Sequence, residues 1–182
     1  MHQIIIETCT IPDGVTASLE GTIVRVKGPK GELTRFFSEK NVKVTLNGKI
    51  LKAEAERGTK REKRQIGTLI AHVKNMCRGV QKPYIYDLKI CSGHFPMTVS
   101  IQGGILSVKN FLGEKVPRTL KLKEGAKVEM KGDHISVESP NIELAGGIAA
   151  EIERVCRIAN RDRRVFQDGI YITHKDGVPV GI

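Results

Sequence analysis

Tryptophan is absent from this chain of 182 residues, and aromatic residues of all kinds make up only 4% of it. Proteins that bind single-stranded nucleic acid on an aromatic platform stack successive bases on such side chains. A chain so poor in aromatic residues is not expected to bind its ligand mainly in that way. Contact with a folded, phosphate-rich surface fits the composition better.

Long apolar runs are missing as well. No stretch approaches the roughly 20 apolar residues that a membrane-spanning helix needs. The first residues, Met1 to Glu7, are too few and too soon charged to form a signal peptide. We therefore expect a soluble protein that stays on the cytosolic side.

Paired cysteines are the third absence. The chain has Cys9, Cys77, Cys91 and Cys156, which lie so far apart that no C-x-x-C pair exists, and this argues against a zinc ribbon or finger. Cys77 and Cys156 are expected at equivalent positions on two helices. We interpret the cysteines as small buried thiols in a reducing compartment.

The chain does contain an internal repeat. Residues 15–32 can be laid without a gap on residues 97–114, so that apolar positions, a glycine and a Lys-x-x-x-Gly-Glu spacing coincide. The match continues less tightly through residues 68–78 against 147–157. The repeat predicts two related modules, which favours a binding protein over a protein with one catalytic cleft.

Alternation of apolar and polar residues predicts a β-hairpin at the start of each repeat. The hairpins are expected over residues 15–27 and 97–109, and further short strands over residues 41–46, 50–53, 127–131 and 135–138. Each module is therefore expected to be mostly antiparallel sheet.

Helical spacing of apolar residues predicts a helix at the end of each module. The first begins at Thr59, with Glu62 completing a capping box, continues to Val80, and is stopped by Gly79 and Pro83. The domain boundary is expected between residues 80 and 87, which gives domains 1–82 and 83–182.

The second helix carries an apolar stripe from Leu144 to Ala159. Gly146 and Gly147 weaken its first turn by about 1 kcal/mol each relative to alanine, and they mark either the helix start or a point of close packing. The predicted fold class is α+β, with two repeated domains that each pack an antiparallel β-sheet against an α-helix.

Basic residues outnumber acidic ones, 30 to 20, for a net charge of +10, which favours a polyanionic partner. Two clusters hold much of this charge. The first contains Arg57, Lys60, Arg61, Lys63 and Arg64, and the second contains Arg154, Arg157, Arg161, Arg163 and Arg164. The first cluster is equally consistent with a solvated surface and with contacts to phosphate. The second is wholly arginine, whose planar fork can bind phosphate through two hydrogen bonds.

Three other features are open to a chemical interpretation. The glycine-bearing loop at residues 27–31 lacks the spacing of a nucleotide-binding loop, so Lys30 either contacts RNA backbone or lies in a plain turn. Cys91 and His94 place a thiol near an imidazole, but no third orienting group is evident, and we interpret them as structural. His72 is interpreted as a half-buried packing residue.

Several ordered motifs resemble one known family. They are Val26-Lys27-Gly28-Pro29-Lys30-Gly31, His72-Val73-Lys74-Asn75-Met76, His94-Phe95-Pro96, Lys109-Asn110-Phe111-Leu112-Gly113-Glu114-Lys115 and Asp168-Gly169-Ile170-Tyr171. The set spans almost the whole chain and is similar to the universal large-subunit ribosomal protein six, called protein nine in eukaryotes. Asn-Phe-Leu-Gly-Glu-Lys and Asp-Gly-Ile-Tyr resemble the archaeal and eukaryotic branch of that family.

The resemblance implies a structural protein with no enzymatic activity, and the residues themselves indicate no cofactor or metal site. It implies binding to large-subunit rRNA, chiefly through the second domain, near the sarcin-ricin loop and the stalk base where translation factors dock. The partners would be this rRNA and neighbouring large-subunit proteins, including those of the stalk base, with no membrane or small-molecule substrate. The location would be the large subunit in the cytoplasm, and the nucleolus during assembly in a eukaryote.

Residues that match the family's motifs would inherit RNA binding. These are Lys109, Asn110, Lys115, Arg157, Arg161, Arg163, Arg164, Tyr171, His174 and Lys175. Secondary RNA contacts are expected from the charge pattern at Lys30, Lys60, Arg61, Lys63 and Arg64. The alternatives are a free-standing RNA-binding or RNA-chaperone module and, third, a thiol enzyme that uses Cys91 and His94.

Overall fold

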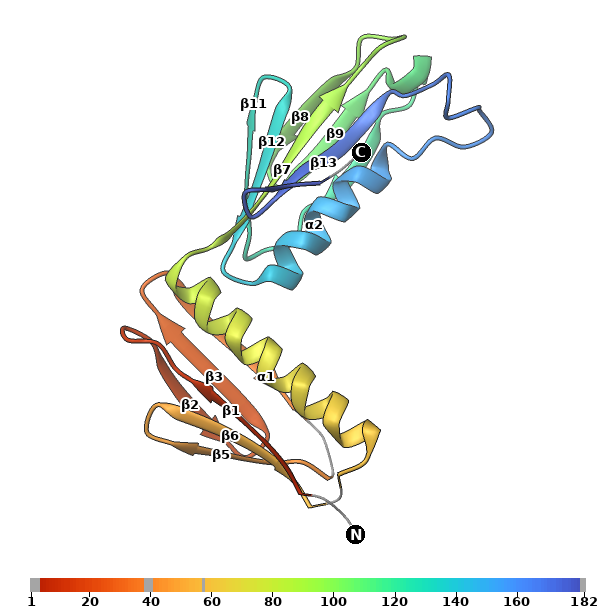
Figure 1. Ribbon diagram of the computed structural model, residues 1–182. Coiled ribbons are helices and arrows are strands. Elements are labelled where there is room, and N and C mark those ends of the chain that lie inside the picture. Colours follow the sequence, from red (N-terminus) through yellow and green to blue (C-terminus); the bar gives the residue numbers. More distant parts are fainter. Residues whose placement is uncertain (1–3, 38–40, 57, 181–182) are drawn as a thin grey trace. The chain divides into compact units, whose positions relative to one another are not determined.

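The chain forms two compact units, Met1–Pro83 and Tyr84–Ile182, which we call domain one and domain two (Figure 1). The computed structural model describes residues 4–37, 41–56 and 58–180. Arg57, which belongs to the first predicted basic cluster, lies outside the described residues.

Domain one is built from six strands followed by one long helix. Its strands form two antiparallel sheets, with the orders β1-β6-β5 and β2-β3-β4. The elements are β1 (Ile5–Thr10), β2 (Thr16–Glu20), β3 (Ile23–Gly28), β4 (Gly31–Phe36), β5 (Lys43–Asn47), β6 (Ile50–Ala55) and α1 (Lys60–Gln81).

Domain two repeats this plan and adds to it. Its described strands also form two antiparallel sheets, with the orders β10-β9-β8 and β11-β12-β7-β13-β14. The elements are β7 (Tyr84–Cys91), β8 (Thr98–Gln102), β9 (Ile105–Lys109), the 3-10 turn η1 (Phe111–Gly113), β10 (Arg118–Lys121), β11 (Lys127–Lys131), β12 (His134–Ser139), α2 (Ile142–Val155), β13 (Gly169–Lys175) and β14 (Val178–Pro179).

The strand orders show the duplication directly. β2-β3-β4 corresponds to β8-β9-β10, and β1-β6-β5 corresponds to β7-β12-β11. The predicted α+β class, with antiparallel sheets in two repeated domains, is confirmed. The duplication ends at β13, which pairs with the free edge of β7 and makes it an interior strand of the larger sheet.

α1 begins where the capping pattern predicts. Thr59 is the N-cap, and its side chain accepts a hydrogen bond from the Arg61 amide at 3.3 Å. Glu62 bonds to the Thr59 hydroxyl and to Asn41, and hydrogen bonds from backbone amides and from Asn41 lower the pKa of Glu62. The side chains of the first turn therefore satisfy amides that a helix start leaves open.

The prediction that Gly79 stops α1 is wrong. Gly79 is buried inside the helix, which continues to Gln81, and Lys82 is the C-cap. Pro83 follows directly, and because proline disfavours a helical residue before it, the helix ends there rather than at the glycine.

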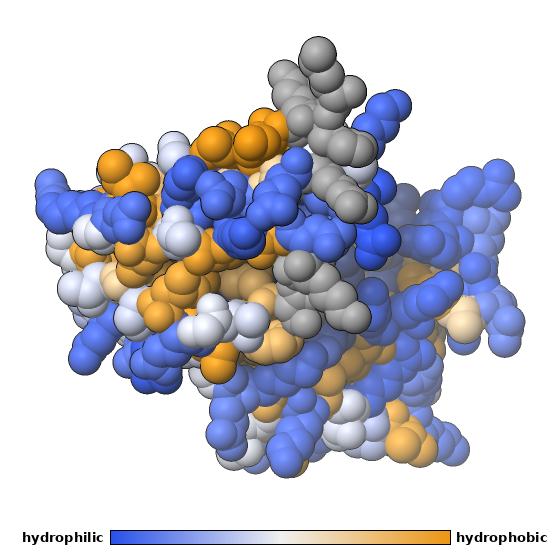
Figure 2. All heavy atoms as spheres, turned by 90° about the horizontal axis from the view of Figure 1, so that it is seen from below, coloured by the Kyte–Doolittle hydropathy of each residue, from blue (hydrophilic) through white to orange (hydrophobic). Residues whose placement is uncertain are grey.

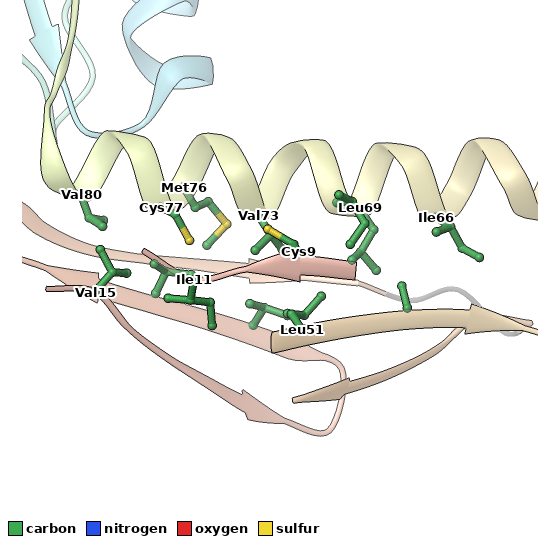
Figure 3. Packing of buried hydrophobic residues seen from close by; sticks show 14 of the residues in the cluster. Cys9, Ile11, Val15, Leu51, Ile66, Leu69, Val73, Met76, Cys77 and Val80 are labelled. Atoms are coloured by element: carbon green, nitrogen blue, oxygen red, sulfur yellow. The ribbon is translucent and has the colours of Figure 1, made fainter. Parts of the chain in front are cut away.

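The apolar stripe of α1 packs on the strands of domain one (Figure 3). The helix contributes Ile66, Leu69, Val73, Met76, Cys77 and Val80, and the facing strands and loops contribute Cys9, Ile11, Val15 and Leu51. Burial beside Cys9 raises the pKa of Cys77 to about 11, so this thiol stays protonated at neutral pH. Cys9, Cys77 and Cys156 are buried free thiols, as expected, whereas Cys91 is only half-buried.

α2 is shorter than the apolar stripe suggested. Asn141 caps its start by accepting from the Glu143 amide at 2.9 Å, and the helix ends at Val155. Ala159 lies beyond it, and Cys156 is the C-cap rather than a helical residue, so these two assignments are wrong. Gly146 marks close packing, since a Cβ there would lie 3.2 Å from the Tyr86 hydroxyl.

Apolar side chains are also exposed. Figure 2 shows one face of the molecule, on which hydrophilic residues cover most of the surface and apolar residues gather between them. In domain one the large exposed apolar residues are Ile4, Ile6, Phe36 and Ile50. Neither of the two described helices is long and apolar enough to cross a membrane.

The glycine loop between β3 and β4 packs on the last turn of α1. Lys30 N donates to Val80 O at 2.9 Å, and a Cβ at Gly28 would lie 2.6 Å from Val80 Cγ2 and 2.9 Å from its carbonyl oxygen. Gly28→Ala is therefore expected to lower the free energy of unfolding by about 1–3 kcal/mol, because it overpacks a backbone contact.

Gly67→Ala is the matched control, because a Cβ at this position of α1 would meet nothing within 4 Å. It should raise stability by about 0.5–1 kcal/mol through helix propensity. Urea unfolding followed by circular dichroism measures both changes. Tyrosine fluorescence serves as the reference because it reports the unfolding of domain two, in which all three tyrosines of the chain lie. Equal stability of the two variants would contradict the packing account.

Candidate nucleic-acid interface

Three connections meet at one end of domain two. They are the β7–β8 loop (92–97), the β9–β10 loop (110–117) and the α2–β13 segment (156–168). Asn110 Nδ2 donates to Pro96 O at 3.0 Å, and a Cβ at Gly113 would lie 3.6 Å from the Phe95 ring. The rings of His94 and Phe166 lie 4.8 Å apart. We call this surface the loop end of domain two.

The β9–β10 loop is where domain two departs from the repeat. Domain one makes a tight turn at this point, with Gly28 paired to Gly31, whereas domain two inserts the turn η1. Asn110 and Leu112 adopt positive φ values of 57° and 48°, which are uncommon for residues with a side chain. This backbone buries Leu112 together with its neighbour Phe111 and leaves Lys109 and Lys115 exposed on either side.

Arg118 ties this loop to the end of α2. Its Nη1 donates to the carbonyl oxygens of Val155 at 2.7 Å and Arg157 at 3.0 Å, and its Nε and Nη2 donate to Glu114. The guanidinium also lies 4.4 Å from the centre of the Phe111 ring. The hydrogen bonds from Arg118 lower the pKa of Glu114, so the pair stays ionised at neutral pH. Lys115 and Arg157 are thereby held on one surface.

The arginines after α2 differ in what surrounds them. Arg164 is paired with Asp162, at 2.8 Å between Nη2 and Oδ2, and this bond lowers the pKa of Asp162. The Arg161 guanidinium lies 5.0 Å from the centre of the Phe166 ring. The positive charge of Arg164 is therefore partly compensated by Asp162 in the free protein.

The remaining predicted cations at the loop end differ from Arg164, because none of them has an ion-pair partner among the described residues. Within residues 58–180, no ion pair involves the side chains of Lys109, Lys115, Arg157, Arg161 or Arg163. All five are exposed. Exposed apolar residues, Phe95, Val116 and Val165, lie in the same loops. A surface of this kind attracts phosphate by charge and offers apolar contact to sugars and bases.

Asp168 organises the β7–β8 loop from the inside. It is 2% exposed and accepts hydrogen bonds from Gly93 N, from His94 N at 2.9 Å and from His94 Nδ1 at 2.7 Å. Burial raises the pKa of Asp168, but the hydrogen bonds from His94 and Gly93 outweigh it, and the pKa lies below its usual value. A charged Asp168 thus fixes the loop that faces Phe166.

This geometry corrects the expectation that no third group orients His94, because Asp168 does so. The described residues around Cys91 show no hydrogen bond between its thiol and His94. Cys91 pairs with Gly169 on the neighbouring strand, in a pocket of about 610 Å³ that Tyr171 and Asp168 also line. The imidazole is held for loop structure rather than for activating the thiol.

β13 separates the other predicted RNA-binding residues. Tyr171 lies near the loop end: its ring covers Gly169, and its hydroxyl donates to Gln167 O at 3.2 Å. His174 and Lys175 pair with Asp87 and Tyr86 toward the opposite end of the strand. Six residues of extended strand span about 20 Å. The structure therefore does not bring His174 and Lys175 together with the arginines.

The predicted secondary contacts of domain one are divided in the same way. Lys30 lies at the C-terminal end of α1, where its amide bonds to Val80. Lys60, Arg61, Lys63 and Arg64 lie in the first turns of the same helix. A helix of 22 residues is about 33 Å long, so these residues do not form one patch with Lys30.

Arg118, Asp168 and Phe166 are the residues that the sequence did not reveal as parts of the site. Arg118 and Asp168 bind backbone groups that lie far away along the chain, 37 and 39 residues for the carbonyls of Arg118 and 74 or 75 for the amides of Asp168. Asp168 lies in the Asp-Gly-Ile-Tyr motif, which was the one available signal.

Two copies of one α+β unit, the second of which gathers exposed cations at its loop end, are the features expected of a structural protein that binds a polyanion. The model of the family described as ribosomal protein L6 matches residues 11–83 and 95–169, so the chain belongs to this family. The family consists of ribosomal structural proteins and not of enzymes, which removes the thiol-enzyme alternative.

Archaeal relatives support the same assignment. The chain is 40% identical over 166 residues to a protein of Methanospirillum hungatei (91% of this chain and 94% of the relative) and 42% identical over 172 residues to one of Desulfurococcus amylolyticus (93% and 94%). It is 44% identical over 175 residues to a protein of Nanoarchaeum equitans (92% and 91%). Each of these is described as large ribosomal subunit protein uL6.

Proposed function

We propose that this protein is a structural constituent of the large ribosomal subunit and that the loop end of domain two is its principal anchor on rRNA. The observation that carries the proposal is the gathering of five cations at the loop end, where hydrogen bonds hold the three connections together. Lys109 ends β9, Lys115 lies on the β9–β10 loop, and Arg157, Arg161 and Arg163 lie on the α2–β13 segment. Relatives that match more than nine-tenths of their length carry the name of a large-subunit protein.

The proposed contacts are mainly to phosphate and sugar. Double-stranded RNA has a narrow major groove that side chains cannot read, so proteins recognise its shape, its phosphates and its 2′-hydroxyls. Arginine suits this task because its fork donates two parallel hydrogen bonds to one phosphate. Tyr171 would add a contact beside the principal anchor, and His174 and Lys175 would add contacts toward the other end of β13.

The proposed position is next to the sarcin-ricin loop and the stalk base, where the protein supports the region that translation factors use and meets the proteins of the stalk base. This position rests on the family resemblance and on the hydrogen bonds that hold the loop end together, since a support must keep its shape. The protein would act in the cytoplasm, and it would pass through the nucleolus during assembly in a eukaryote.

Sedimentation tests the proposal against a free-standing RNA-binding module. A lysate is given a high-salt wash and separated on a sucrose gradient, and the fractions are probed for this chain. We expect it to travel with the large subunit, because many phosphate contacts and neighbouring proteins retain it. Recovery at the top of the gradient would overturn the ribosomal assignment. In washed subunits with and without the protein, chemical modification should show protection of the sarcin-ricin loop and the stalk base only when it is present.

A further inference from the structure

A second basic site lies in domain one, in an open pocket between the edge strand β4 and the N-terminal half of α1. The pocket measures about 460 Å³. The lining residues that matter are Arg35, Phe36, Arg61, Arg64, Thr68 and His72. Arg61, Arg64 and Thr68 are spaced by three or four residues and therefore share one face of the helix.

The charge of this pocket has one sign. Among the described lining residues there is no aspartate or glutamate. Glu62, in the first turn of α1, is 5% exposed, and its carboxylate bonds to Asn41 and Thr59. In the same part of the chain, no hydrogen bond or ion pair engages the guanidinium groups of Arg61 and Arg64. The pocket therefore presents arginine forks to an anion.

Arg35 is held in a fixed position at the other wall. Its Nη2 lies 3.1 Å from His72 Nε2, and its guanidinium lies 5.9 Å from the centre of the Phe37 ring. A ring nitrogen that accepts from arginine belongs to a neutral histidine. His72 is half-buried, as expected for a packing residue, and it orients one arginine without adding a charge of its own.

Phe36 supplies the second part of a nucleotide site. Phe36 is 63% exposed although it is large and apolar, and it is among the residues that line the pocket. Aromatic side chains beside arginines bind unpaired nucleotides, since the base stacks on the ring while the phosphate takes hydrogen bonds. Because aromatic residues are scarce, the chain cannot form an extended stacking platform, but a site that uses a single ring is compatible with the composition.

We propose that this pocket binds one unpaired nucleotide of RNA, with its base on Phe36 and its phosphate on Arg61, Arg64 and Arg35. The inference rests on the proposed function only in taking that RNA to be ribosomal. It also divides the first basic cluster, because Arg61 and Arg64 line the pocket whereas Lys60 and Lys63 do not.

The lack of tryptophan provides a local reporter. Phe36→Trp places a single indole at the pocket rim of the full chain, and stacking of a base on it quenches its fluorescence. The probe is a single-stranded RNA of about ten nucleotides, the length that one small binding surface covers. We expect saturable quenching that weakens as salt rises, since phosphate contacts release counterions.

Arg61→Gln with Arg64→Gln, made in the Phe36→Trp chain, should weaken this quenching at least about tenfold and reduce the salt slope by about one unit. Lys74→Gln with Lys82→Gln removes the same charge from the far face and end of α1 and should change affinity less than about twofold. Equal losses in the two pairs, or quenching by poly-glutamate as strong as that by RNA, would overturn the nucleotide site and indicate a general anion surface.

The quenching of the indole at position 36 is expected not to depend on domain two. Arg157→Gln, Arg161→Gln and Arg163→Gln together should leave the indole quenching unchanged, because these residues lie in the other domain. Quenching that disappears with this triple variant, while the Arg61 and Arg64 replacements have no effect, would refute the pocket and leave the loop-end anchor standing. The opposite pattern supports the pocket whatever happens at the loop end.

Discussion

Replacing Arg157, Arg161 and Arg163 by glutamine lowers the affinity of the full chain for large-subunit rRNA by about two to three orders of magnitude. Each replacement removes charge-assisted hydrogen bonds to phosphate that contribute about 1–1.5 kcal/mol. The salt dependence of binding should flatten at the same time by about two to three units of slope, close to one unit for each lost phosphate contact. Filter binding over a range of salt concentrations measures both quantities.

The fold should not suffer from these changes, because all three side chains are exposed. Lys121→Gln, Lys123→Gln and Lys127→Gln form the matched control, since they remove the same charge from exposed positions of domain two outside the loop end. The control should lose less than about fivefold in affinity, through the general field of the protein alone. If the control and the arginine variant lose affinity equally, net charge and not the loop end determines binding.

Asp168→Ala should cause the largest loss of stability in domain two, about 2–4 kcal/mol. The replacement removes a buried carboxylate that accepts from the amides of Gly93 and His94 and from the His94 ring. Each bond from a charged acceptor contributes about 1.5 kcal/mol or more, and the freed amides lose their partner. Urea unfolding followed by tyrosine fluorescence reports this domain alone, since all three tyrosines lie in it.

The acid sensitivity of domain two follows from the same carboxylate. Because the pKa of Asp168 is lower in the folded than in the unfolded state, its contribution is complete above about pH 5 and is lost as pH falls through the folded pKa. Asp168→Asn keeps the shape and can still accept from the amides, so it should unfold with a weaker dependence on pH between about 5 and 2. An Asn variant with the pH dependence of the natural chain would show that other carboxylates are responsible.

Local patterns in the sequence predict much of the fold because they depend on neighbouring residues. Alternation identified the hairpins that became β2–β3 and β8–β9, and Thr59 with Glu62 identified the start of α1. β7 was not recognised, although it is the interior strand that joins the two halves of the larger sheet. Its partner β13 has no counterpart in domain one, so the repeat could not indicate it.

The kinds of residue in the candidate site could also be predicted from the sequence, but their arrangement in space could not. Arginines clustered along the chain do lie together, at the loop end. His174 and Lys175 follow these arginines closely in the sequence, yet they lie toward the far end of β13. Each residue of an extended strand adds to the distance from the start of the strand, so a short separation in sequence becomes a long one in space. The roles of Arg118 and Asp168 depend on carbonyls and amides that only folding brings to them.

Photo-crosslinking in intact ribosomes tests the central claim most directly. A photoreactive amino acid is placed at Lys115, on the loop end, or at Thr8, an exposed residue of β1 in domain one, and the crosslinked rRNA is mapped. We expect the reagent at Lys115 to crosslink to large-subunit rRNA near the sarcin-ricin loop, and the reagent at Thr8 to give little or no rRNA product. Strong rRNA crosslinks from Thr8 with none from Lys115 would show that the loop end of domain two is not the anchor.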